Sequence, residues 1–246
     1  MPGTFVCVTG ASSGIGRALA ESLPFESGDL ITVSRRPAPV GEWVEADLSD
    51  PAAWPGIGAR FADALAAAPY RRAVFLHFAG AGSPHEHAAR AGLEEYTASV
   101  LLNAASGPVL GKAFISACQA AGVPATVVLC SSPGAAEPMP AMSHYGSGKL
   151  GMEYWVRAIA AEHGADGGVH AFAVVPWSVD TPMVREVIDV QPERQPAAVA
   201  LRDAAERGEL ASAESTADEI WRLVVDGVAP GAVVPVGAVP AGMEIA

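Results

Sequence analysis

Short apolar runs alternate along the chain with longer segments in which apolar residues recur every three or four positions. The short runs are rich in β-branched residues and mostly lack in-and-out alternation, which is typical of strands covered on both faces. The longer segments have the period of amphipathic helices, and several end at glycine or proline. We expect strands at residues 4–9, 30–34, 43–45, 73–78, 126–130, 170–175 and 232–236, and helices at about 14–23, 52–68, 93–121, 143–163, 183–206 and 214–226.

This alternation predicts an α/β fold: a doubly wound parallel sheet (Rossmann fold) of about seven strands with helices on both faces. The 246 residues suit one large domain, and no low-complexity linker divides them. Residues 131–143 are too irregular for an ordinary connection. Residues 182–208 include Pro192 and Pro196, so we expect this segment to cover the carboxyl ends of the strands, where open sheets bind ligands.

Composition narrows the choice of partners. The formal charge of -12 argues against nucleic acid and anionic membrane surfaces, which both favour clusters of Lys and Arg. We find no apolar stretch that reaches the ~18 residues that a membrane span needs. A strand begins by residue 4, which leaves no room for a signal peptide, so we expect a cytoplasmic protein.

We expect no metal site. The three cysteines are far apart in the sequence and form no CxxC pair. The His-Glu-His run at residues 85–87 places its histidines two positions apart, so they do not share a helix face, and no third ligand is evident.

The first predicted strand leads into the sequence TGASSGIG at residues 9–16, which opens the first helix. Glycines permit a tight turn and a close approach of the backbone to phosphate, and the helix N-terminus supplies N–H donors. The spacing is GxxxGxG, not the GxGxxG of other dinucleotide folds. Its place at the first βα turn favours dinucleotide binding over an ordinary Gly/Ser loop. The expected cofactor contacts are Gly10, Ser12, Ser13, Gly14, Ile15 and Gly16.

The end of the second strand bears on the choice of cofactor. NAD enzymes usually place an acidic residue here to bond the ribose 2′-hydroxyl, but this chain has Ser34 followed by Arg35 and Arg36. A small hydroxyl and two guanidinium groups suit a 2′-phosphate, so NADP(H) is favoured over NAD(H). The alternative is that the arginines are solvated loop cations. Asp47 and Leu48, after the third strand, are expected to border the adenine.

Tyr145 and Lys149 stand four residues apart at the start of a predicted helix, so the phenol and the ammonium share one face. A tyrosine of ordinary pKa ~10 is a poor acid–base group at neutral pH, and a nearby cation lowers that pKa. By itself, such a pair of side chains most often lies on the solvent-exposed face of a helix. Here Ser132 precedes it, just past the fifth strand, where its hydroxyl can meet a carbonyl oxygen.

Together these motifs resemble the short-chain dehydrogenase/reductase family, over nearly the whole chain. TGASSGIG matches the TGxxxGxG cofactor loop, Tyr145 and Lys149 match the catalytic YxxxK, and Ser132 matches the strand-five serine. Asn103 falls where the family has its catalytic asparagine. The sequence PWSVDTPM at residues 176–183 resembles the family's PGxVxTxM, which borders the nicotinamide. From these motifs the resemblance implies further cofactor contacts at Ala79, Gly80, Pro176, Val179 and Thr181, and at Tyr145 and Lys149.

The resemblance also implies a mechanism. NADPH would deliver hydride to a carbonyl carbon while Tyr145 gives a proton to the oxygen. Ser132 would hydrogen-bond that oxygen, and Lys149 would lower the tyrosine pKa and bind the nicotinamide ribose. Asn103 would link Lys149 to a water relay. Oriented donors aimed at developing charge are a general source of rate enhancement, and the chain looks nearest to sepiapterin-reductase-like and related bacterial carbonyl reductases.

The chain departs from the family at two places. The family's NNAG after strand four reads HFAG, with His77 and Phe78 instead of the asparagines. Trp177 replaces the glycine of the strand-six PG pair, where its ring either restricts the substrate or fills core volume. The residues expected to face the substrate are Met139, His144, Trp177 and Met183, with core packing as the alternative for each.

The favoured function is the NADPH-linked reduction of a small ketone or aldehyde. An NAD-linked alcohol dehydrogenase would use the same residues in reverse, and Ser34 with Arg35 argues against it. A non-catalytic dinucleotide-binding regulator would not need the intact Tyr145 and Lys149.

The family usually pairs its two long helices across two-fold axes. Here residues 93–121 and 143–163 are apolar on more than one face, which predicts a homodimer or homotetramer.

Overall fold

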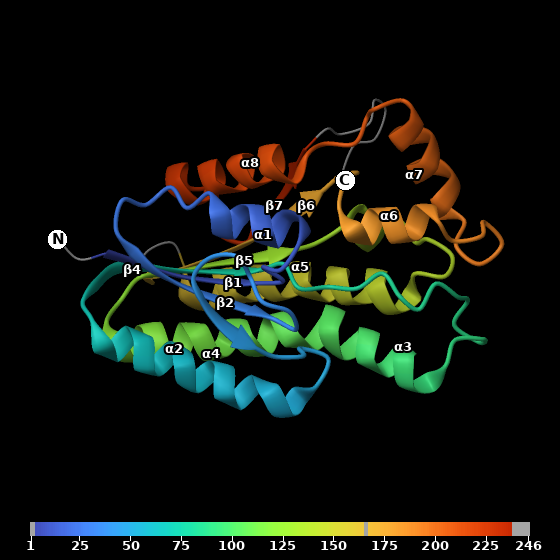
Figure 1. Ribbon diagram of the computed structural model, residues 1–246. Helices are drawn as coiled ribbons and strands as arrows, with labels where there is room; N and C mark the ends of the chain where they lie inside the picture. Colours follow the sequence, from blue (N-terminus) through green and yellow to red (C-terminus); the bar gives the residue numbers. More distant parts are fainter. Residues whose placement is uncertain (1–2, 165–166, 238–246) are drawn as a thin grey trace.

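In the computed structural model, which describes residues 3–164 and 167–237, a parallel sheet lies between two layers of helices (Figure 1). The seven strands have the order β3-β2-β1-β4-β5-β6-β7, as expected of a doubly wound sheet. The predicted fold class is confirmed. The strands are β1 (Gly3–Thr9), β2 (Gly28–Ser34), β3 (Glu42–Glu45), β4 (Tyr70–His77), β5 (Ala125–Cys130), β6 (Val169–Pro176) and β7 (Val233–Val236).

Alternate residues of the central strands enter two separate cores. Phe5 and Cys7 of β1 pack with α2 (Trp54–Ala67), α4 (Ser106–Ala121) and α5 (Ser143–His163). Val6 and Val8 pack on the other face with α1 (Gly14–Glu21) and α8 (Ala213–Asp226). Figure 1 shows these two helix layers on opposite sides of the sheet. Both faces of β1 are therefore buried, which explains the absence of polar alternation in its sequence.

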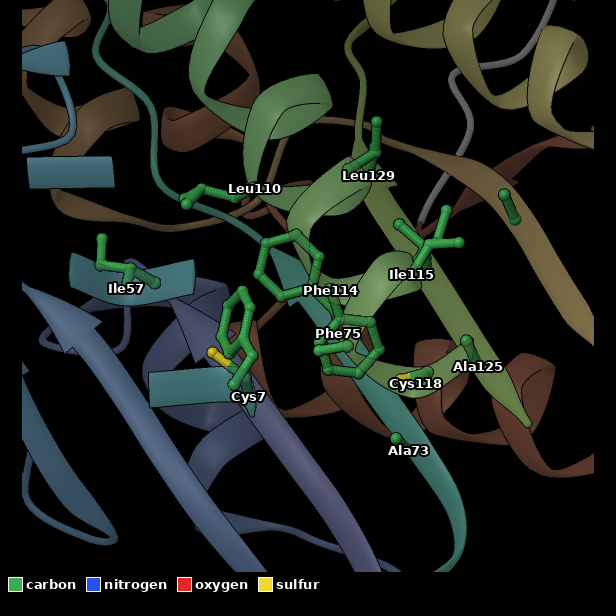
Figure 2. Packing of buried hydrophobic residues seen from close by; sticks show 14 of the residues in the cluster. Cys7, Ile57, Ala73, Phe75, Leu110, Phe114, Ile115, Cys118, Ala125 and Leu129 are labelled. Atoms are coloured by element: carbon green, nitrogen blue, oxygen red, sulfur yellow. The ribbon is translucent and has the colours of Figure 1, made fainter. Parts of the chain in front are cut away.

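The centre of the larger core lies where α4 crosses the middle of the sheet (Figure 2). Phe114 of α4 stacks on Phe75 of β4, with ring centroids 5.5 Å apart, and Leu110 lies one turn before it. All three side chains are fully buried. Residues of this size each contribute roughly 1.5–3 kcal/mol on burial, so this packing fixes the position of α4 on the sheet.

Two expected helices differ in detail from the prediction. The run at 93–121 is helical throughout, but it contains α3 (Leu93–Val100), a wider π-helical turn at Leu101–Ala105, and then α4. The single helix expected at 183–206 is wrong: the structure has α6 (Pro182–Ile188) and α7 (Ala197–Glu206) with an irregular connection between them. Pro192 and Pro196 explain the break, because proline lacks an N–H and clashes with the preceding helical turn.

The helical run Leu93–Ala121 is also long and apolar enough, by length and composition, to span a membrane. This corrects the expectation that no segment would qualify. The α4 part of this run carries Leu110, Phe114, Ile115 and Cys118 in the core against the sheet. Core packing in this domain therefore accounts for its apolar character.

Candidate active site

One cavity of about 440 Å³ lies at the carboxyl ends of the strands. Its walls come from the β1–α1 turn, the ends of β2, β4, β5 and β6, the start of α5, and α6. Every residue that the sequence assigned to the cofactor lies in this wall: Gly10, Ser12, Ser13, Gly14, Ile15, Gly16, Ser34, Arg35, Arg36, Asp47, Leu48, Ala79, Gly80, Tyr145, Lys149, Pro176, Val179 and Thr181. Contact between these residues and a cofactor stays a prediction.

The glycines of the β1–α1 turn leave no room for side chains. Gly10 has a φ of +72°, and a Cβ there would lie 2.8 Å from the backbone of Phe78 and Ala79. A Cβ at Gly16 would lie 2.5 Å from the carbonyl oxygen of Gly10. The turn therefore packs closely on the end of β4 and on the first turn of α1. Its backbone at the N-terminus of α1 lines the cavity. A phosphate group fits this type of cradle.

At the other end of the cavity, Ser34 shapes the turn that presents the two arginines. Its hydroxyl donates to the carbonyl of Arg36 at 2.6 Å, while both arginine side chains are exposed. Burial opposes the ionisation of Asp47, but hydrogen bonds from Ser49 and the charge of Arg35 lower the pKa of Asp47. The carboxylate is therefore ionised at neutral pH and lies close enough to Arg35 to influence it.

The catalytic candidates Ser132, Tyr145 and Lys149 all lie in the same part of the cavity wall. Ser132 follows β5 and caps a short 3₁₀ turn, with its Oγ accepting from the N–H of Gly134 at 3.2 Å. The Tyr145 phenol is close enough for the Ser132 hydroxyl to lower its pKa. Lys149 is 2% exposed, donates from Nζ to the carbonyl of Cys130 at 2.8 Å, and lies 5.3 Å from the centroid of the Tyr145 ring.

Burial, not the nearby cation, dominates the acidity of this phenol in the structure. Desolvation, with a smaller effect of Cys130, raises the pKa of Tyr145, and the hydrogen bond from Ser132 only partly offsets it. Burial likewise lowers the pKa of Lys149. The expected lowering of the tyrosine pKa by Lys149 is therefore not the leading effect here. A phenol with a raised pKa is fully protonated at neutral pH, as a proton donor must be.

Asn103 lies in the π-helical turn and is completely buried outside the cavity wall. Its Nδ2 donates to the carbonyl of Ala81 at 3.0 Å and to Ser99 Oγ at 3.0 Å, and its Oδ1 accepts from the N–H of Ala81 at 3.3 Å. A Cβ on Gly148 would lie 2.8 Å from the Asn103 carbonyl, so that glycine lets α5 approach the turn. The site therefore includes Asn103 as a buried support for the loop after β4.

The four residues expected to face the substrate divide into two pairs. Trp177 and Met183 line the cavity. Met139 does not; its Sδ-methyl packs over Gly134, where a Cβ would lie 2.7 Å away. His144 is a correction: it is 1% exposed, lies outside the cavity wall and bonds Ser99 and Pro84. Its position as the second residue of α5 directs it towards α3 and the β4 loop, which the sequence pattern did not reveal.

The sequence also missed several residues of the cavity wall. These residues adjoin predicted positions on the same segments, and that adjacency is the signal by which the sequence could have indicated them. They are Val33, Ala46, Phe78, Ala81, Gly82, Ser83, Leu102, Cys130, Ser131, Pro182, Val184 and Glu186. Within residues 3–164 and 167–237, no group of three or more His, Cys, Asp or Glu side chains is placed to hold a metal ion.

Comparison with known proteins agrees with this geometry. The family model described as enoyl-(acyl carrier protein) reductase matches residues 10–228. No curated protein matches the chain. A short-chain dehydrogenase/reductase of Saccharomyces cerevisiae superposes with a TM-score of 0.80 at 20% identity, covering 95% of this chain and 96% of that one. The aldohexose dehydrogenase of Thermoplasma acidophilum gives 0.79 at 21% identity, covering 99% and 98%.

A short-chain dehydrogenase family protein of Francisella tularensis superposes with a TM-score of 0.74 at 19% identity, covering 96% of this chain and 97% of that one. At such identities the superpositions establish the fold, and the family model establishes the relationship. The chain belongs to the short-chain dehydrogenase/reductase family. It is an oxidoreductase of the class that uses NAD(P)(H) to interconvert carbonyl and alcohol groups.

Proposed function

We propose that this protein reduces a ketone or aldehyde to an alcohol with NADPH. The observation that carries the proposal is a single cavity with Ser132, Tyr145 and Lys149 at one end and Arg35 and Arg36 at the other. Between the ends lies the glycine turn, whose backbone is open to phosphate. Bound NADPH would supply the hydride for the reduction.

The protein's own groups handle the proton and the charge. Tyr145 is buried and protonated, so it can donate to the oxygen of a carbonyl placed beside Ser132. The Ser132 hydroxyl lies in the same part of the cavity wall and would donate its single proton to the same oxygen. Lys149, anchored on the Cys130 carbonyl, places a cation beside the Tyr145 ring, where its charge would stabilise the phenolate left when the proton passes to the developing alkoxide.

The preference for NADPH over NADH rests on the end of β2. No carboxylate occupies the position after Val33, and both exposed guanidinium groups lie in the cavity wall. The 2′-phosphate of NADPH would accept charge-assisted hydrogen bonds from Arg35. A carboxylate at Ser34 would instead repel this phosphate, so its absence supports the proposal.

The test measures reduction and binding separately. Purified protein is offered aromatic diketones, pterin-like ketones, 3-oxoacyl thioesters and an enoyl thioester, with NADPH or NADH, and the loss of reduced cofactor is followed. We expect turnover of a carbonyl compound with NADPH. Turnover of the enoyl thioester alone, or a preference for NADH, would overturn the proposal.

Arg35→Ala sharpens the test of the cofactor. We expect the Kd for NADPH to rise about 10- to 150-fold, the equivalent of losing one charge-assisted contact, with NADH binding nearly unchanged. Arg207→Ala is the matched control, because Arg207 is an exposed arginine that pairs with Glu209 and lies outside the cavity wall. An equal loss for both cofactors would show that Arg35 is structural.

We further propose that the protein is a homodimer or homotetramer that pairs α4 and α5. Val109, Leu150 and Tyr154 are exposed on these helices, and Tyr154 is 72% exposed. A two-fold axis would set each apolar patch against its own copy. Light scattering should give a mass of about 50 or 100 kDa, two or four times that of one chain. A mass near the 25.1 kDa of a single chain would contradict this assembly.

A further inference from the structure

Two buried histidines flank the π-helical turn that carries Asn103. His77 ends β4 and is 0% exposed, while His144 begins α5 and is 1% exposed. Neither lines the cavity, so neither is placed to touch a substrate or a cofactor. Each ring nitrogen of both histidines nevertheless has a hydrogen-bond partner, and these partners connect the two rings to residues of the active site.

The hydrogen bonds of His77 have only one consistent direction. The Ser106 hydroxyl donates to the carbonyl of Leu102 at 2.6 Å, so its oxygen accepts from His77 Nε2–H at 3.2 Å. A neutral ring then leaves Nδ1 as an acceptor for the Thr9 hydroxyl, 3.0 Å away. Thr9 Oγ1 in turn accepts from the backbone N–H groups of Phe78 and Ala79, each at 3.1 Å.

His77 thereby joins two parts of the site. Thr9 directly precedes Gly10 of the cofactor turn, and Leu102 directly precedes Asn103. A Cβ on Gly107 would lie 2.9 Å from the His77 ring, so the start of α4 is shaped to hold an imidazole. Burial, together with the charge of Lys149, lowers the pKa of His77 to about 3, which keeps the ring neutral.

The hydrogen bonds of His144 are fixed in the same way. Its Nε2 lies 3.0 Å from the carbonyl of Pro84, which can only accept, so Nε2 carries the proton. Its Nδ1 therefore accepts from the Ser99 hydroxyl at 2.9 Å, and Ser99 Oγ accepts from Asn103 Nδ2. Burial lowers the pKa of His144; the Pro84 and Ala141 carbonyls oppose this, and of the charged neighbours His85 lowers it and Glu95 raises it.

We propose that His77 and His144 are positioning residues that hold the Asn103 turn from its two sides as neutral Nε2–H tautomers. His77 couples the backbone of the turn to the cofactor loop. His144 orients the Asn103 amide, which in turn holds Ala81 and the loop beside Gly80. Their effect on turnover rests on the proposed reductase function, whereas their tautomers and their effect on cofactor binding do not.

The first experiment uses the wild-type protein and needs no activity. Nitrogen-15 NMR of the histidine rings distinguishes the two tautomers and the cation. We expect two rings, assigned by single substitution, with the proton on Nε2 and a bare Nδ1 at neutral pH, and for His77 no titration between about pH 5 and 8. A proton on Nδ1, or a charged ring, at either residue overturns the proposal for that residue.

The second experiment separates the two ends of each ring. Asparagine places its Oδ1 acceptor where the imidazole has Nδ1 but reaches nothing at Nε2, and leucine offers neither group. His144→Leu should lower kcat about tenfold, the usual scale for a buried polar partner left unpaired, with the NADPH Kd within about twofold of wild type. His144→Asn should recover most of this loss, because it keeps the acceptor for Ser99.

His77 should show a different pattern, because its Nδ1 faces the cofactor loop. His77→Leu should both weaken NADPH binding and lower kcat, each about tenfold. His77→Asn should restore the NADPH affinity through Thr9 while kcat remains low. His170→Asn is the control, since His170 is the second residue of β6, lies at the opposite end of the strands and is half-buried.

The outcomes remain distinguishable if a variant is unstable. Should the leucine variants lose thermal stability while the folded fraction keeps wild-type kcat and Kd, the histidines are packing residues only and the proposal fails. Identical behaviour of the asparagine and leucine variants would also overturn it. If the wild-type protein reduces no carbonyl compound, the proposed function fails, and the NMR and the NADPH affinities still decide the roles of the two rings.

Discussion

The start of α5 and the covering segment at residues 182–208 border the same cavity, but different contacts hold them. A Cβ on Gly146 would lie 2.5 Å from the Gly134 carbonyl, and one on Gly148 2.8 Å from that of Asn103, so α5 is fixed by backbone meeting backbone. The covering segment is tied to the β4 loop through side chains, such as Glu186 with His85 at 3.1 Å and Arg194 with Glu86 at 3.5 Å.

Burial follows the same division. Tyr145 and Lys149 of α5 are buried, whereas in α6 and α7 only Val187 and Ala198 are. Backbone packing cannot change without moving a helix, but surface side chains can be exchanged at little cost. The start of α5 is therefore a fixed centre that holds the catalytic side chains, whereas residues 182–208 form a cover whose side chains can be exchanged. Substitutions in the fixed centre should have larger effects than substitutions in the cover.

The largest effect should come from the fixed centre. Tyr145→Phe removes the proton donor and keeps the ring, so kcat should fall at least about 100-fold, within the range for acid–base catalysis. The fold, by circular dichroism, and NADPH binding, by fluorescence, should be retained. Tyr154→Phe on the exposed face of α5 is the matched control and should retain wild-type kcat. A near wild-type rate for Tyr145→Phe contradicts the mechanism.

The close packing of α5 on the Asn103 turn should make the free energy of unfolding sensitive to an added methyl group at this contact. Gly148→Ala forces a methyl group against the Asn103 carbonyl and should cost about 1–3 kcal/mol of unfolding free energy in urea titrations. Gly151, three residues further along the same helix, has open space around its Cα. Gly151→Ala should therefore stabilise the protein by up to about 1 kcal/mol. Equal effects of the two substitutions would show that α5 is not closely packed at this point.

Lowering the pH should reduce the free energy of unfolding through His77, which lies beside the Asn103 turn. The unfolded chain protonates His77 near its ordinary pKa of 6.5, while the folded chain does so only near 3. Stability is therefore fully present above pH 6.5 and is lost as the pH falls towards 3. The loss from this residue should reach about 2 kcal/mol by pH 5, measured by urea unfolding at several pH values. His77→Asn should have a flatter pH dependence; an unchanged slope would assign the acid sensitivity to other groups.

The smallest effect should come from the cover. Met183 lines the cavity from α6 and is half-buried. Met183→Ala should change kcat/KM for small carbonyl compounds by up to about tenfold, the low end of what one apolar contact contributes, because the side chain is only half-buried. The order of preference among larger substrates should change instead. Met183→Leu, which conserves volume, should keep the original order, and a large loss of kcat in either variant would show that the cover takes part in the chemistry.

Much of this protein follows from local sequence patterns. The buried strands, the glycine turn and the pair at Tyr145 and Lys149 were all predictable, because each depends on residue type and spacing within one or two elements. The placement of Ser34 and Arg35 at the end of β2 was equally readable, since parallel strands bring their carboxyl ends to one edge of the sheet. The break between α6 and α7 was foreshadowed by two prolines, although one helix was expected there.

Tertiary structure decided which polar residues support the site. His144 was expected to face the substrate and instead bonds Ser99 and Pro84, because the rotation of α5 on its neighbours sets the direction of each side chain. His77 contacts Thr9, which is distant in sequence, and the acidity of Tyr145 is governed by burial. Hydrogen-bond partners and desolvation depend on what lies across a packed interior. The sequence alone therefore determined the class of chemistry, and only the packed fold determined how its groups are held and how acidic they are.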